Sequence, residues 1–168
     1  MINVRFALIC LAGFALATPA QAEVIGEHND WIATQGSEAG KPLCYISAEP
    51  QKSAGDYTKR GQIYAIVTHR PAEKSLGVVS FQAGYTLDNA KPVTITIDGK
   101  TTFSLFAQDE FAWAREAADD LALVKAMRGG SNMVVKGTSS RGTLTTDTFS
   151  LSGFTAAINA INKACGVK

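Results

Sequence analysis

Apolar and polar residues alternate along much of the chain at a spacing of two, the pattern of β-strands that bury one face. Residues 62–69 are nearly continuous in apolar and β-branched side chains, which predicts a central strand covered on both faces. Polar stretches at 35–41 and 51–60 are predicted loops, and 109–115 combines strand spacing with alanines and is ambiguous. Seven further strands are predicted at 31–34, 43–48, 77–85, 93–97, 102–107, 132–136 and 144–151.

The strands on either side of Asp98 and Gly99 form a predicted hairpin whose register can be argued from the side chains. A two-residue turn would place Ile95 opposite Thr102 and would mix an apolar face with a polar one. A loop of odd length avoids this mismatch. We therefore predict a three-residue connection with a glycine bulge at Gly99, and not the type I′ turn that Asp-Gly usually favours.

Residues 117–128 have the features of a helix. Asp119 and Asp120 lie near its positive end, where the helix dipole favours carboxylates, and two glycines follow where it would stop. The side chains expected to face the core are Leu121, Val124 and Met127.

A second helix is predicted at the end of the chain, with a cysteine on its apolar stripe. Ser152 is expected to cap its start, and Gly166 stands where a left-handed residue would end it. The residues of the stripe follow i, i+3, i+4, i+7, i+11 spacing and must be buried: Phe154, Ala157, Ile158, Ile161 and Cys165.

Eight strands largely in succession, with two helices, are typical of a mainly β fold. We predict an antiparallel β-sandwich with two short peripheral helices. Residues 23–168 have the length of one domain and can bury a core without many covalent links.

Residues 1–22 have the organisation of a secretory signal peptide: Arg5, then a run of about a dozen apolar residues, then Ala20-Gln21-Ala22 as a cleavage signature. The run is shorter than the ~20 residues that cross a bilayer, and no later segment approaches that length. We expect cleavage near Ala22, a mature chain without a membrane span, and a periplasmic, secreted or cell-surface location.

Two cysteines, Cys44 and Cys165, remain after removal of the signal peptide and its Cys10. In an oxidising compartment they have one intramolecular pairing, which would close a loop of about 120 residues and stabilise the fold by roughly 4–5 kcal/mol in the chain-entropy model. Intermolecular pairing and a reactive thiol remain alternatives.

Composition excludes several kinds of partner. Without Arg5, 15 basic residues face 15 acidic ones, interspersed along the chain, so we expect no nucleic-acid binding. Two distant histidines and scattered carboxylates predict neither a metal site nor a cofactor.

Two arginines are candidate partner contacts. Arg70 lies between His69 and Pro71 at a strand end and could form an anion-binding corner, although a solvated or strand-capping arginine is the more common case. Arg141, which follows two serines in a loop, has the same alternatives. Phe111 and Trp113 are aromatic contacts for a glycan or protein partner if they are exposed, but core packing is their commoner role.

Several short motifs are spread over nearly the whole chain after residue 22. They are Trp31, Leu43-Cys44-Tyr45-Ile46 with Pro50, Thr68-His69-Arg70-Pro71, Ala126-Met127-Arg128-Gly129-Gly130, 137–143, 149–154 and the terminal Cys165. Through these motifs the chain resembles the invasion-associated locus B family of exported alphaproteobacterial proteins. The resemblance implies an immunoglobulin-like β-sandwich at the periplasm or cell surface, without established catalytic residues, and in some pathogens an association with virulence through host-cell entry.

These observations favour a non-enzymatic envelope protein that binds a protein or glycan partner. Two alternatives stay open. A periplasmic hydrolase would need His69 in a cavity with a hydroxyl and a carboxylate. A purely structural or stress-related envelope protein would bind no ligand and would lose much of its stability when the disulfide is reduced.

Overall fold

The computed structural model describes residues 22–167, so the predicted signal peptide, apart from Ala22, and Cys10 lie outside the described residues. Within this range the chain forms eleven strands, two α-helices and a 3₁₀ turn. They are β1 (Glu23–His28), β2 (Trp31–Glu38), β3 (Lys41–Ala48), β4 (Lys52–Gly55), β5 (Tyr64–Arg70), η1 (Pro71–Glu73), β6 (Ser75–Gln82), β7 (Val93–Ile97), β8 (Thr101–Gln108), β9 (Phe111–Trp113), α1 (Ala117–Gly129), β10 (Asn132–Thr138), β11 (Leu144–Ser150) and α2 (Phe154–Ala164).

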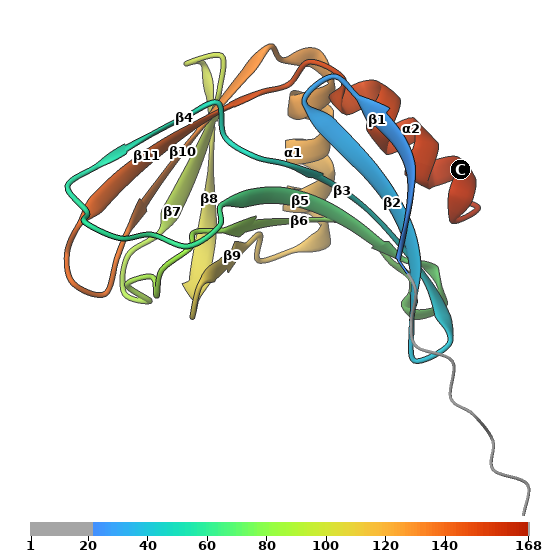
Figure 1. Cartoon of the computed structure of the whole chain (residues 1–168), viewed down its shortest axis with the longest axis horizontal. Coiled ribbons are helices and arrows are strands. Elements are labelled where there is room, and N and C mark those ends of the chain that lie inside the picture. The colour runs from blue at the N-terminus through green and yellow to red at the C-terminus, as the bar shows by residue number, and fades with distance from the viewer. Residues whose placement is uncertain (1–21, 168) are drawn as a thin grey trace, which may run out of the picture.

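The strands form one antiparallel sheet in the order β1-β2-β3-β5-β6-β9-β8-β7-β10-β11-β4. The sheet is strongly bent, so that β1, β2, β3, β5 and β6 form one half and β7, β8, β10, β11 and β4 form the other (Figure 1). Phe81 on β6 contacts Phe149 on β11 edge to face, with ring centroids 6.2 Å apart, and so joins the halves across the core. The predicted mainly β, sandwich-like fold is confirmed, with layers continuous through β9 and β8.

Strand β4 connects the two halves in an unexpected way. After β3 the chain crosses to the far edge of the sheet, where β4 pairs with β11, and then returns to β5 beside β3. The returning segment, residues 56–63, therefore runs between the halves (Figure 1).

The three strands that the sequence analysis did not predict carry few alternating apolar residues. Strand β1 lies in a segment for which the pattern predicts no element, and β4 lies in the predicted loop at 51–60. Both are edge strands, and neither has a buried side chain. Strand β9 has only three residues. The predicted loop at 35–41 is instead the end of a hairpin, because β2 and β3 pair as far as Glu38 and Lys41.

The β7–β8 hairpin has the predicted register. Ile95 pairs with Phe103, and Ile97 pairs with Thr101 across a three-residue connection. The predicted glycine bulge is wrong in detail, because Asp98 also has a positive φ of 50° and the Lys100 N–H donates to the Ile97 carbonyl. Compared with a two-residue turn, the additional residue of this loop is Lys100. It follows Asp98 and Gly99, which are both in the left-handed conformation.

Helix α1 buries Met127 as predicted, and Val124 is partly buried against the core. The prediction is wrong for Leu121, which is 64% exposed, whereas Asp120 and Leu123 are buried. Asp120 accepts a hydrogen bond of 2.8 Å from the Val79 N–H, which lies just beyond the segment of β6 that pairs with β9. The apolar periodicity therefore did not indicate that the Asp120 carboxylate is buried and accepts a hydrogen bond from a backbone N–H of β6 that β9 leaves without a partner.

Helix α2 buries its predicted stripe against β1, β2, β3 and β5, and Trp31 meets Phe154 edge to face with centroids 4.9 Å apart. Ser152 is not the cap as predicted. Gly153 holds that position with φ 89°, and a Cβ there would overlap the His28 carbonyl. Gly166 has the predicted left-handed conformation, with φ 64°.

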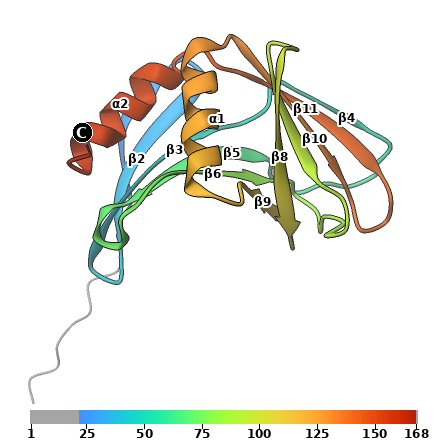
Figure 2. The same cartoon turned by 180° about the vertical axis from the view of Figure 1, so that it is seen from behind.

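Cys44 and Cys165 form the predicted disulfide, with Cα atoms 6.1 Å apart. It ties the end of α2 to β3, and both helices lie on the same side of the first half of the sheet (Figure 2). In residues 22–167 no helix is long and apolar enough to cross a membrane.

Candidate functional site

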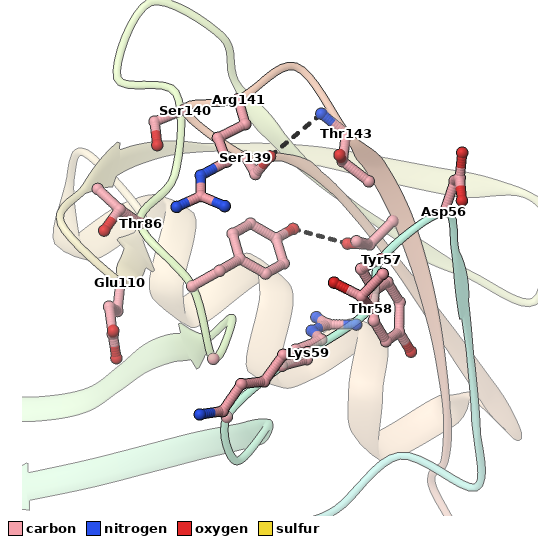
Figure 3. A pocket seen from close by; sticks show the side chains of 15 residues that line it. Asp56, Tyr57, Thr58, Lys59, Thr86, Glu110, Ser139, Ser140, Arg141 and Thr143 are labelled. Carbon is pink, nitrogen blue, oxygen red and sulfur yellow. Dashed lines mark hydrogen bonds between the residues drawn. The ribbon is translucent and has the colours of Figure 1, made fainter.

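A cavity of about 670 Å³ opens where three connections meet. Its walls come from the segment that returns from β4, from the residues that follow β6, and from the turn between β10 and β11 (Figure 3). Loops held on a rigid sheet are a common place for binding residues. The lining residues used below are Asp56, Tyr57, Thr58, Lys59, Arg60, Tyr85, Thr86, Glu110, Ser139, Ser140, Arg141, Thr143 and Thr145.

Arg60 anchors the returning segment beneath this cavity. Its two terminal nitrogens donate to the two carboxylate oxygens of Asp147, each at 2.7 Å, and its Nε donates to the Ala83 carbonyl at 2.7 Å. The side chains of Arg60 and Asp147 are 4% and 0% exposed. Burial lowers the pKa of Arg60, but the hydrogen bond and charge of Asp147, together with contributions from Tyr57 and Tyr85, raise it overall. The pair joins the end of β6 to β11.

Two tyrosines hold the Arg60 guanidinium between them. Its central carbon lies 5.4 Å from the Tyr57 ring centroid and 4.9 Å from that of Tyr85. The Tyr85 hydroxyl shares a hydrogen bond of 2.6 Å with Thr145 Oγ1 on β11. Burial raises the pKa of Tyr85, with the Thr145 hydrogen bond acting in the opposite direction. This side of the cavity is therefore built in advance of any ligand.

Arg141 enters the cavity from the β10–β11 turn, and its guanidinium points inward (Figure 3). The turn is fixed by hydrogen bonds from the Ser139 N–H to the Thr143 carbonyl, at 2.9 Å, and from the Thr143 N–H to Ser139 Oγ, at 3.1 Å. The Ser140 N–H donates to the Thr86 carbonyl at 2.8 Å. No ion pair joins Arg141 to a carboxylate of residues 22–167.

Arg70, the other predicted contact, lies elsewhere. It is at the end of β5, and its Nε donates to Glu38 Oε2 at 2.8 Å on the surface. The β2–β3 and β5–β6 connections lie at the opposite end of the molecule from the β10–β11 turn (Figure 1). The structure thus separates the two predicted arginines and places only Arg141 in this cavity.

His69 is buried and does not line the cavity. Its Nδ1 accepts a hydrogen bond from the Gly77 N–H at 2.8 Å, so its Nε2–H donates to Asn162 Oδ1 at 2.8 Å. Burial lowers the pKa of His69, although the Asn162 hydrogen bond raises it. Both ring nitrogens are engaged in joining β5, β6 and α2, which is not the arrangement that the hydrolase alternative requires.

Phe111 and Trp113 are half-exposed, because Ala112 between them takes the core position. Their rings stack with centroids 5.5 Å apart, and Phe106 on β8 lies 5.8 Å from Trp113. The expected core packing is therefore wrong, and the three rings form an aromatic patch on the outer face of β8 and β9. No group of three potential metal ligands occurs within the part of the chain that the structure describes.

Sequence reasoning missed Arg60 because it stands in a segment predicted as a polar loop. Its partner did leave a signal. Asp147 stands between Thr145 and Phe149 on the inward-facing positions of β11, and an inward carboxylate requires a partner.

A family model described as invasion associated locus B (IalB) protein matches residues 31–162. No curated protein and no solved structure matches the chain.

Proposed function

The chain belongs to the invasion associated locus B family, and on this premise we propose that it is an exported, non-enzymatic envelope protein that binds a partner through the Arg141 cavity. Family membership supports the envelope association. The cavity supports binding, since it combines a cationic side chain with walls that are already fixed. The partner is a protein or a glycan.

The observation that carries the proposal is the contrast within the cavity between a neutralised arginine and an available one. Arg60 is paired with Asp147 and stiffens the wall, whereas exposed Arg141 points into the open space. A wall that is already fixed loses little conformational entropy on binding, so less of the contact energy is offset by the cost of ordering the site.

Arg141→Ala tests the proposal. The wild-type protein and the variant are used to capture partners from an envelope extract, and bound proteins and glycans are quantified by mass spectrometry. Arg70→Ala is the matched control, because it removes another exposed arginine far from the cavity. We expect Arg141→Ala to lose partners that Arg70→Ala retains; equal partner sets from both variants would remove the cavity from the proposal.

Export is tested by the intact mass of protein purified from the periplasm, with thiols alkylated before and after reduction. We expect a mass that begins at Glu23 and two thiols that react only after reduction. A mass that includes residues 1–22 would contradict cleavage at the predicted site.

A further inference from the structure

The chemistry of the cavity restricts what Arg141 can bind. Arg60 and Arg70 each contact a carboxylate, but Arg141 has none among the described residues. A guanidinium presents paired N–H donors that match a planar carboxylate or a phosphate. The cavity therefore has a place for one anionic group.

The other charged residues of the lining favour a carboxylate over a phosphate. Asp56 and Glu110, both exposed, also line the cavity, as does the exposed Lys59. The free charges of the lining therefore balance, and they do not offset the double charge of a phosphate. A ligand with a single carboxylate places less negative charge in the cavity. If its remaining groups are hydroxyls, the same two carboxylates accept hydrogen bonds from them.

Hydroxyl groups dominate the polar lining. Thr58, Thr86 and Ser140 are exposed around the opening, and Figure 3 shows them distributed around the cavity with Thr143. Each hydroxyl both donates and accepts hydrogen bonds, as sugar hydroxyls do. Such a lining matches a saccharide better than an apolar ligand.

Aromatic side chains on one wall of the cavity also fit a saccharide. Tyr57 is 37% exposed and lines the cavity beside Tyr85, and both rings are held by Arg60. Ligand sites commonly combine aromatic walls with a few fixed polar groups. A sugar ring offers an apolar C–H face to such a wall while its edge carries the hydroxyls.

We infer that the cavity binds an acidic saccharide, with its carboxylate on Arg141, its ring against the Tyr57 and Tyr85 wall, and its hydroxyls on the surrounding threonine and serine side chains. This inference rests on the proposed function and names the ligand class of the same site. The acidic sugar has two sources with this chemistry, the bacterial cell wall and glycans of a host surface.

The test is titration of the ¹⁵N-labelled mature protein with N-acetylmuramic acid, N-acetylneuraminic acid and neutral N-acetylglucosamine, followed by NMR. We expect the acidic sugars to shift amide signals of residues 56–61, 84–86 and 139–143, and the neutral sugar to bind about ten-fold more weakly, since a charge-assisted contact is lost. A preference between the two acids identifies the source.

Arg141→Gln is the matched variant, because it retains polarity without charge. We expect it to reduce affinity for the acidic sugars by about ten-fold and to leave neutral-sugar binding unchanged, whereas Arg70→Gln should alter neither. Tyr57→Ala should weaken acidic and neutral sugars alike. Unchanged thermal melting of each variant shows that it is folded.

Equal binding of acidic and neutral sugars, or equal behaviour of Arg141→Gln and Arg70→Gln, would overturn the inference. If no sugar binds but capture of an envelope partner still requires Arg141, the saccharide inference fails while the proposed function stands. If capture is also independent of Arg141, both fail.

Discussion

At one end of the molecule Arg60 is bound by Asp147 in a buried ion pair, whereas at the other end Arg70 contacts Glu38 at the surface. The first contact has two hydrogen bonds of 2.7 Å between side chains that are 4% and 0% exposed. The second has one of 2.8 Å between side chains that are 36% and 61% exposed. The chemical groups are nearly the same, but water competes only for the second pair.

The end that carries Arg70 is held together by other means. Cys44 pairs in register with His69, and both residues are linked to α2, one through the disulfide and the other through Asn162. We therefore expect a contact between distant strands to stabilise the fold strongly where it is buried or covalent, and weakly where it is exposed.

Loss of the disulfide should lower the free energy of unfolding more than any of the other changes below. Replacing Cys44 and Cys165 together by alanine frees a loop of about 120 residues in the unfolded chain, which the chain-entropy model equates with roughly 4–5 kcal/mol. Urea denaturation of the variant and of the oxidised parent measures this difference. A difference below about 1 kcal/mol would show that the Arg70 end does not depend on its covalent link.

Asp147→Asn should cost about 3–5 kcal/mol of unfolding free energy, because it leaves the Arg60 charge buried without a counter-charge. The double variant Arg60→Met with Asp147→Leu should recover most of this loss, since a buried ion pair and an apolar pair are often of similar stability. Urea denaturation checks both. Equal stability of Asp147→Asn and the parent would mean that water reaches the pair.

His69 should make the stability of the protein depend on pH through the end of the molecule that carries Arg70. Burial lowers its folded pKa, so the unfolded chain binds the extra proton more readily and stability falls as the pH drops below the unfolded value of about 6.5. A proton on Nδ1 would also disrupt the bond from the Gly77 N–H, a loss on the order of 1 kcal/mol.

Urea midpoints between pH 5 and 8 measure this dependence. His69→Gln is the control and should flatten the part of the profile that belongs to this residue. The same slope in parent and variant would assign the acid sensitivity to other groups.

Arg70→Ala should have the smallest effect, about 0–1 kcal/mol, because the contact with Glu38 is exposed and screened by salt. Thermal melting at low and high salt measures it, with Glu38→Gln as the matched partner variant. A loss comparable with that of Asp147→Asn would contradict the distinction between the two ends.

Much of the fold was predictable from local pattern. The strands that alternate strongly, the register of the β7–β8 hairpin and the buried stripe of α2 follow from side-chain spacing. Strands β1 and β4 did not, because an edge strand with exposed side chains is defined by its neighbours and has little pattern of its own. On α1, Asp120 takes a core position that a purely apolar stripe would not assign to it.

The site was predictable in part. Arg141 stood out as a charged residue in a serine-rich turn, and it does line the cavity. Arg60 and Asp147 are 87 residues apart, and they meet only because β4 carries the chain to β11 before it returns. Such a meeting depends on topology, so no spacing in the sequence could indicate it.

The packing of α2 also sets an order of assembly. Trp31 and Cys44 near the beginning of the described chain are completed by Phe154 and Cys165 near its end. A polypeptide that emerges from its N-terminus therefore cannot finish its first half until its last helix has been delivered. Until that moment β2 and β3 lack part of their cover, and their apolar residues stay accessible to water.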